Sequence, residues 1–257
     1  MVARRTVLAA LLGAAGCAAA PVVPPAPSAA PEPVTIERRA SAARRRDVDV
    51  VTVRPAGQGG DLPVCLLLHG RGSTAHSMVG LGIPQFLTSA VAAGVPPFAA
   101  VAVDCGAGYF TAHPDDDALR MLTDELPGWI GRAPFAALGI SMGGFGALRL
   151  ARVRGDLRAV ALLSPAMFLS WPDARSRNAF ADEAEWAADE PLRHLPDVAG
   201  TPMGLWIGQG DPFLAAARRL IAGVRPDPAV VGPGGHDDAF WRRVLPDALA
   251  FVGRHAA

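Results

Sequence analysis

The chain has 257 residues, of which 51% are hydrophobic, and these values fit one globular domain with a sizeable core. Its 24 basic and 24 acidic residues cancel, so the formal net charge at pH 7 is zero. This balance argues against a nucleic acid or a strongly acidic surface as the partner, because either would need an excess of basic residues.

Residues 1–17 have the pattern of an export signal. Arg4 and Arg5 form a basic start, and the apolar run at residues 7–15 is too short to span a bilayer. Cys17 follows a Leu-Leu-Gly-Ala-Ala-Gly stretch that resembles a bacterial lipobox, and the Arg-Arg pair resembles a twin-arginine signal. We therefore expect export to the cell envelope, with a lipid on Cys17 as a membrane anchor. A plain cleaved signal and secretion are the alternative.

Residues 18–33 are rich in Ala and Pro and carry one charge. Such a segment cannot build a core, and its prolines favour extended backbone, so we expect a semi-rigid linker. The remainder, residues 34–257, is then the predicted catalytic domain.

Apolar strands alternate with helices through this domain. Strands are expected at residues 34–36, 48–53, 64–68, 98–103, 135–138, 159–163, 203–207 and 229–231. Helices are expected at residues 84–93, 117–130, 179–188, 212–222 and 238–252, and directly after the glycines of residues 139–146. The alternation predicts an α/β protein, a three-layer α/β/α sandwich with a mostly parallel central sheet.

Two further thiols lie near the predicted strands. Cys65 is early in one strand, and Cys105 is just past the end of another. If these strands are parallel neighbours, the two residues are offset by about four positions, roughly 13 Å, which is too far for a disulfide. We expect both to be buried as small hydrophobic residues.

The sequence Gly-Ile-Ser-Met-Gly joins a predicted strand to a predicted helix and fits a nucleophile elbow. Ser141 is at the apex of the turn, where its hydroxyl would point out of the sheet. Gly139 and Gly143 remove side chains that would collide as strand and helix approach. The N–H of Met142 then lies at a helix N-terminus, where it can donate to an oxyanion. An ordinary Gly-rich turn is the alternative.

A serine at the elbow needs a base, and only three histidines follow it: His194, His236 and His255. His255 is at the C-terminus, and His194 precedes the last two strands. His236 lies in a Gly-rich loop after the last strand, which is the place expected for the base.

The base needs an acid that orients it, expected between the serine and the histidine in the chain. Asp211 directly follows a strand and is the first candidate; an N-cap role for it is the alternative. Asp227 is the second candidate. Acidic residues 182, 183 and 185 fit a solvated helix face.

The loop His69-Gly70-Arg71-Gly72 follows a buried strand and can supply a second oxyanion donor, the backbone N–H of Arg71. Gly70 lets the backbone approach the substrate. The Arg71 side chain would reach an anionic substrate group or solvent, and His69 fits a structural role.

Four motifs together resemble the α/β-hydrolase superfamily, and within it the esterase D-like branch that includes bacterial mycolyltransferases. They are Leu-His-Gly-Arg-Gly, Gly-Ile-Ser-Met-Gly-Gly, Gly-Gln-Gly-Asp-Pro-Phe and Gly-Gly-His-Asp-Asp-Ala-Phe-Trp. The resemblance implies a Ser141–Asp211–His236 triad with the Arg71 and Met142 amides as oxyanion donors. It does not fix the substrate.

Aromatic side chains near these motifs could line an acyl pocket or belong to the core: Tyr109, Phe110, Trp171 and Trp241. His113 beside three aspartates fits a helix start better than a metal site, so no metal and no cofactor are expected.

Three hypotheses follow from the sequence. The first is an exported serine esterase acting on a small-molecule or lipid ester. The second is an acyltransferase acting on envelope sugars or lipids, and the third is a non-catalytic envelope lipoprotein. A peptidase also stays open, because the same triad cleaves amides. The sequence indicates no oligomeric state.

Overall fold

The computed structural model describes residues 25–28 and 30–256. The predicted export signal, including Cys17, and part of the predicted linker lie outside these residues, so export and lipid attachment stay predictions. In the described part of the chain, no helix combines the length and the apolar character that crossing a bilayer requires.

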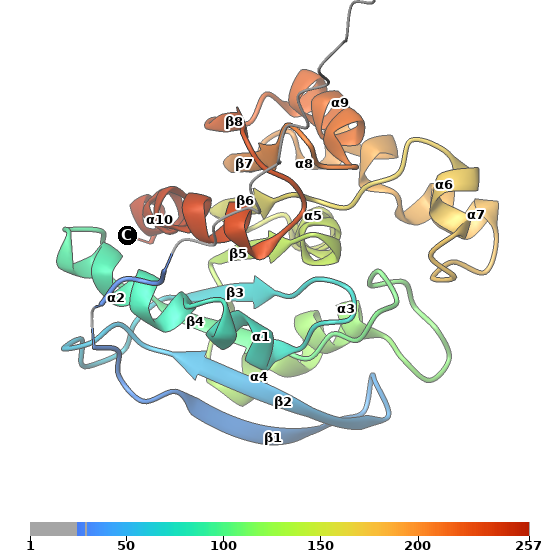
Figure 1. Ribbon diagram of the computed structural model, residues 1–257. Helices are drawn as coiled ribbons and strands as arrows, with labels where there is room; N and C mark the ends of the chain where they lie inside the picture. The colour runs from blue at the N-terminus through green and yellow to red at the C-terminus, as the bar shows by residue number, and fades with distance from the viewer. Residues whose placement is uncertain (1–24, 29, 257) are drawn as a thin grey trace, which may run out of the picture.

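An eight-stranded sheet runs through the middle of the domain (Figure 1). Its order is β1-β2-β4-β3-β5-β6-β7-β8, and only the β1/β2 and β2/β4 pairs are antiparallel. The strands are β1 (Thr35–Ser41), β2 (Arg46–Val53), β3 (Val64–Leu68), β4 (Ala99–Val103), β5 (Ala136–Ile140), β6 (Ala159–Leu163), β7 (Met203–Gly208) and β8 (Ala229–Gly232). Strands β3 to β7 are buried along their whole length, which explains their unbroken apolar sequences.

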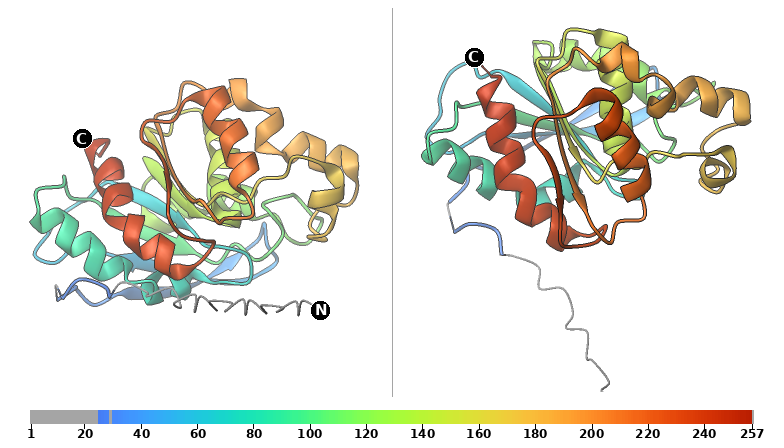
Figure 2. Two further views of the ribbon diagram at one scale, coloured as in Figure 1. Left: turned by 45° about the horizontal axis from the view of Figure 1, so that its top comes forward. Right: turned by 90° about the horizontal axis from the view of Figure 1, so that it is seen from above.

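Helices cover both faces of the sheet, as the two views of Figure 2 show. One face carries α1 (Ala75–Gly80), α2 (Ile83–Ala92) and α10 (Asp238–Arg254). The other carries α3 (Ala118–Arg120), α4 (Leu126–Ile130), α5 (Met142–Arg154), α6 (Trp171–Arg175), α7 (Glu183–Asp189), α8 (Leu195–Val198) and α9 (Leu214–Val224). The predicted three-layer architecture is therefore confirmed.

One helical region agrees with the sequence expectation, whereas the short helices α1, α6 and α8 were not predicted. The helical path through residues 118–130 continues past Pro127, because a π-helical turn (Met121–Glu125) precedes it and the proline occupies the first turn of α4. Helix α1 begins after Thr74, where a capping box with Ser77 satisfies the first backbone N–H groups.

Cys65 lies on β3, and Cys105 follows the end of the neighbouring parallel strand β4 by two residues, as expected. Cys65 pairs with Ala100, so Cys105 stands five residues beyond that partner instead of the predicted four. Both side chains are buried, and burial raises the pKa of the Cys105 thiol to about 12. Neither thiol is therefore ionised at neutral pH.

Candidate active site

Ser141 connects β5 to α5 in a strained turn. Its φ of 56° is in the left-handed region, which a side chain other than glycine enters only at a cost. A Cβ on Gly143 would overlap the carbonyl group of Leu68, and a Cβ on Gly139 would overlap the backbone of Gly143. The predicted strand–turn–helix geometry is confirmed, with the glycines at the two closest backbone approaches.

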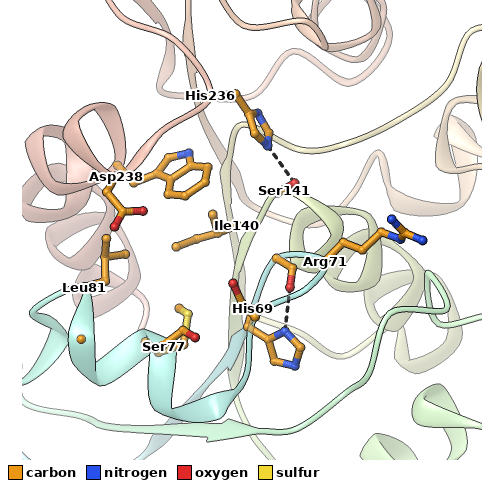
Figure 3. A pocket seen from close by; sticks show the side chains of 13 residues that line it. His69, Arg71, Ser77, Leu81, Ile140, Ser141, His236 and Asp238 are labelled. Carbon is orange, nitrogen blue, oxygen red and sulfur yellow. Dashed lines mark hydrogen bonds between the residues drawn. The ribbon is translucent and has the colours of Figure 1, made fainter. Parts of the chain in front are cut away.

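A continuous chain of hydrogen bonds links the three residues of the predicted triad, and Figure 3 shows the bond between His236 and Ser141. The Nε2 atom of His236 is 2.9 Å from the Ser141 hydroxyl oxygen. Its Nδ1 atom is 2.8 Å from Oδ2 of Asp211. Each residue follows the end of a parallel strand: β5, β7 or β8. The structure thus brings these side chains together, while their catalytic roles stay a prediction.

The other candidates for the acid and for the base lie away from Ser141. Asp227 precedes β8, and its N–H donates to the carbonyl of Met203, the first residue of β7. It is therefore at the end of the strands opposite to Asp211. His194 contacts the Ala187 carbonyl, and His255 contacts that of Phe251 near the end of α10.

The Asp211 carboxylate is buried, and its environment favours the ionised form. Burial alone would raise its pKa, but hydrogen bonds from His236 and the Phe213 N–H, together with the nearby Ser164 hydroxyl, outweigh burial and hold the pKa below its usual range. The Phe213 N–H is 2.8 Å from Oδ1. An ionised Asp211 accepts the Nδ1–H of His236, which leaves Nε2 free to accept a proton from Ser141.

Sequence reasoning missed Ser164, which is fully buried directly after β6. The rule that located the other site residues, a polar side chain at the end of a parallel strand, applies to it equally. Two aromatic rings also flank His236: Phe213 with its centroid 5.2 Å away and Trp241 at 5.3 Å. They restrict the imidazole to the orientation that contacts Ser141.

Two backbone N–H groups beside Ser141 have no acceptor within the described chain: those of Arg71 and Met142. Met142 is the first residue of α5, so its N–H points out of the helix N-terminus. The loop before Arg71 touches the nucleophile, because a Cβ on Gly70 would be 3.4 Å from the Cβ of Ser141. These two donors can stabilise a negative oxygen, as the sequence predicts.

A cavity of about 490 Å³ opens beside Ser141 (Figure 3). Gly70 and Trp241 line it, as predicted for substrate-binding residues. Its apolar wall is formed by Met78, Leu81 and Ile140, and its polar wall by Ser73, Ser77 and Asp238. The Arg71 side chain also borders the cavity, and its Nη2 donates to the carbonyl of Arg177 at 3.0 Å. This volume and mixed lining suit a small organic ligand.

Tyr109 does not line this cavity, so its predicted pocket role is wrong. Only 2% of the residue is exposed, and its ring packs edge-on against Phe145 with 5.3 Å between centroids. The next residue, Phe110, is equally buried, because Gly146 of α5 leaves room for its ring. Trp171 packs against Trp186, away from Ser141.

Within the described residues, no group of three or more His, Cys, Asp or Glu side chains could hold a metal ion. Asp117, one of the three adjacent aspartates, caps α3 by accepting the N–H of Arg120 at 2.9 Å. The interpretation of this segment as a helix start is therefore confirmed.

No protein-family model and no curated protein sequence matches the chain. Solved structures do match it. A ferulic acid esterase has a TM-score of 0.75 at 21% identity, with 88% of this chain and 98% of that chain covered. An S-formylglutathione hydrolase from Agrobacterium tumefaciens has a TM-score of 0.71 at 18% identity, covering 87% and 95%. Fluorophosphonate-binding serine hydrolase F from Staphylococcus aureus has a TM-score of 0.70 at 15% identity, covering 87% and 99%. The chain therefore has the α/β-hydrolase fold.

Proposed function

We propose that the protein is a serine hydrolase that cleaves carboxylic esters through an acyl-enzyme on Ser141. The observation that carries this proposal is the hydrogen-bonded series Asp211–His236–Ser141 at the edge of a ligand-sized cavity. The three solved structures are named as an esterase, an S-formylglutathione hydrolase and a serine hydrolase, and these names support ester hydrolysis.

In the proposed reaction, the Ser141 hydroxyl oxygen attacks the ester carbonyl while His236 takes its proton at Nε2. The negative charge that develops on the carbonyl oxygen is stabilised by the N–H groups of Arg71 and Met142. His236 then gives the proton to the leaving alcohol, and the acyl-enzyme forms. Water, deprotonated by the same imidazole, attacks the acyl carbonyl. The bond to the Ser141 oxygen then breaks, His236 returns the proton to that oxygen, and the acid is released. Asp211 keeps His236 in the required tautomer throughout.

The test is the Ser141→Ala variant, assayed with nitrophenyl esters of increasing acyl length and with a fluorophosphonate probe. We expect turnover and labelling to be lost while the melting temperature stays within a few degrees of the parent. Ser89→Ala, a change on helix α2 away from the cavity, is the matched control and should keep full activity. Turnover by Ser141→Ala at the parent rate would refute the proposal.

Adding an acceptor alcohol to the same assay separates hydrolysis from acyl transfer. Hydrolysis predicts free acid as the product at all acceptor concentrations. A product ester that accumulates in proportion to the acceptor would instead show transfer from the same acyl-enzyme.

We also propose that the protein is exported and anchored through a lipid on Cys17. The basic start, the short apolar run and the lipobox-like sequence support this. Labelling with a fatty-acid analogue in a bacterial host should mark the parent and not Cys17→Ala. Equal labelling of both would contradict it.

A further inference from the structure

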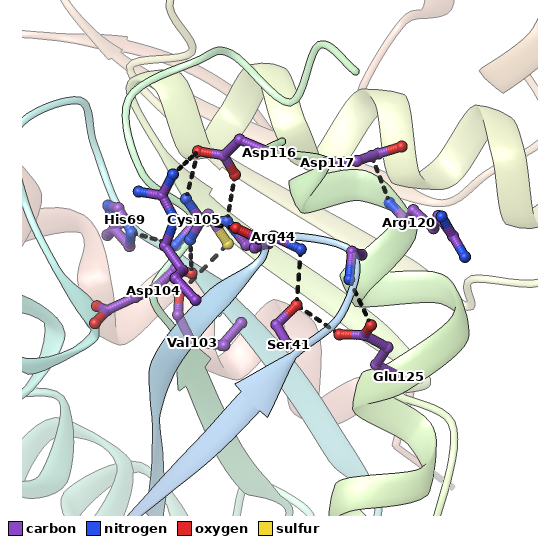
Figure 4. Close-up of polar contacts among 12 residues, drawn as sticks. Ser41, Arg44, His69, Val103, Asp104, Cys105, Asp116, Asp117, Arg120 and Glu125 are labelled. Carbon is purple, nitrogen blue, oxygen red and sulfur yellow. Dashed lines mark hydrogen bonds and ion pairs between the residues drawn. The ribbon is translucent and has the colours of Figure 1, made fainter. Parts of the chain in front are cut away.

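His69 connects the loop after β3 to the loop after β4 (Figure 4). The N–H of Cys105 lies 2.9 Å from its Nε2, and its Nδ1 lies 2.8 Å from the carbonyl oxygen of Gly70. Because a backbone N–H can only donate, Nε2 is the unprotonated nitrogen and Nδ1 carries the hydrogen that Gly70 accepts. Burial lowers the pKa of His69, so this neutral tautomer persists at pH 7.

The carbonyl that His69 holds belongs to the same peptide group as the oxyanion donor. The Gly70 C=O and the Arg71 N–H point in opposite directions across one planar trans peptide. The Ser73 N–H donates to the same carbonyl oxygen at 3.1 Å. The His69 ring and the Ser73 N–H therefore both hold the Gly70 carbonyl oxygen. Both hydrogen bonds oppose a rotation of the Gly70–Arg71 peptide that would turn the Arg71 N–H away from Ser141.

The other side of His69 is anchored just as firmly. The Cys105 N–H shares a peptide group with the Asp104 carbonyl, which accepts from Nη1 of Arg44. Arg44 is 1% exposed, and its Nε and Nη2 lie 2.6 and 3.0 Å from the two carboxylate oxygens of Asp116. Arg44, which is buried and ion-paired with the partly exposed Asp116, thus holds the Asp104–Cys105 peptide. That peptide holds His69, and His69 holds the Gly70–Arg71 peptide beside Ser141.

We propose that His69 is a positioning residue, which holds the Gly70–Arg71 peptide so that its N–H faces the carbonyl oxygen of the substrate. This inference rests on the serine-hydrolase function proposed above. Both ring nitrogens are engaged with backbone groups, so His69 acts through Arg71. An oxyanion donor contributes more in the transition state than in the bound substrate, so its misplacement lowers kcat with little effect on KM.

Two substitutions separate the two hydrogen bonds. His69→Asn keeps an N–H near the position of Nδ1 and removes the acceptor at Nε2. His69→Gln keeps an oxygen that reaches the position of Nε2 and removes the donor to Gly70. We expect His69→Gln to lower kcat about 100-fold with KM within about threefold, as for loss of an oxyanion donor, and His69→Asn to keep kcat within about fivefold.

A trifluoromethyl ketone provides a second readout, because its adduct with Ser141 places an oxyanion at the same position. Its inhibition constant should rise in His69→Gln by the factor by which kcat/KM falls. Parent-like kcat in His69→Gln, or equal losses in both variants with unchanged inhibition, would overturn the inference. If the parent itself neither hydrolyses esters nor binds fluorophosphonate, the proposed function fails instead.

The tautomer can be measured in the parent alone, which covers the case that His69→Gln does not fold. In protein with ¹⁵N-labelled histidine, the His69 resonance, assigned with His69→Asn, should show hydrogen on Nδ1 and should titrate at a lower pH than an unperturbed histidine. Hydrogen on Nε2 would contradict the proposed contact with Gly70.

Discussion

The Asp211 carboxylate accepts the Nδ1–H of His236 over 2.8 Å, although the two residues follow different strands, β7 and β8. Those strands are parallel neighbours in register from Leu205 with Ala229 to Gly208 with Gly232. Their carboxyl ends therefore lie at one edge of the sheet, and the loops that leave them meet there. The pairing of β7 with β8 therefore brings the Asp211 carboxylate to His236. The carboxylate in turn keeps the imidazole hydrogen on Nδ1.

Replacing Asp211 by Asn should lower kcat by about 10² to 10⁴ with the fold intact. The amide N–H₂ can donate to Nδ1, which would move the imidazole hydrogen to Nε2, where it cannot accept the proton of Ser141. Steady-state kinetics with a nitrophenyl ester measure the loss, and circular dichroism checks the fold.

The matched control for this change is Asp227→Asn, at the other end of β8. It should leave kcat within twofold. A large loss in Asp227→Asn together with a small one in Asp211→Asn would mean that the structure pairs His236 with the wrong acid.

Replacing Gly143 by Ala should cost several kcal/mol of folding stability or prevent folding, because the new methyl group would overlap the Leu68 carbonyl. Backbone atoms of a buried strand cannot move aside as a flexible side chain would. Gly128→Ala is the control: its Cβ meets nothing within 4 Å in α4, and it should gain up to about 1 kcal/mol. Urea unfolding of both variants tests this, and equal stabilities would contradict the packing at the elbow.

Trp241 and Trp171 were equivalent pocket candidates in the sequence, and the structure separates them. Trp241 lines the cavity and contacts His236, whereas Trp171 packs against Trp186. We expect Trp241→Ala to lower kcat/KM for bulky esters about tenfold or more, since it removes a wall of the cavity and a support of the imidazole. Trp171→Ala should change melting temperature and leave kcat/KM within twofold. The reverse pattern would place the substrate on the α6 side.

The mostly parallel sheet and the gathering of polar residues at its strand ends could be predicted, because a parallel sheet brings the carboxyl ends of its strands to one edge. Unbroken apolar runs located β3 and β6 with their observed bounds. The elbow was recognisable for the same kind of reason: its glycines are required by local contacts between a strand and the helix that follows it.

Side-chain contacts away from the ends of the strands could not be predicted. Whether Tyr109 faces the cavity or the core depends on Phe145 and Gly146 of α5, which its own neighbours in sequence do not reveal. Helix α1 was not predicted, because it is short and its capping box uses Ser77 in place of Glu or Gln. The role of His69 needs the β3/β4 pairing, which places its loop beside Cys105.

Glu190 is a fully buried carboxyl group outside the catalytic constellation. Three N–H groups donate to it: those of Phe168 at 3.0 Å, Leu192 at 3.2 Å and the Trp186 indole at 3.2 Å. Burial raises its pKa to about 7, and these donors oppose the rise without cancelling it. Glu190 therefore titrates near neutral pH while it holds α7 to the loop after β6.

This raised pKa predicts that stability falls as pH rises. Between about pH 4.5 and 7 the native state keeps the Glu190 proton and the unfolded chain releases it, so the unfolded state binds fewer protons and unfolding becomes easier. The contribution of Glu190 to the free energy of unfolding is complete below about pH 4.5 and is lost above about pH 8. The loss amounts to about 3 kcal/mol. Urea unfolding from pH 5 to 8 should show this slope in the parent and in Glu183→Gln, an exposed control on α7, but not in Glu190→Gln. Identical slopes in all three proteins would show that Glu190 is already ionised at pH 5.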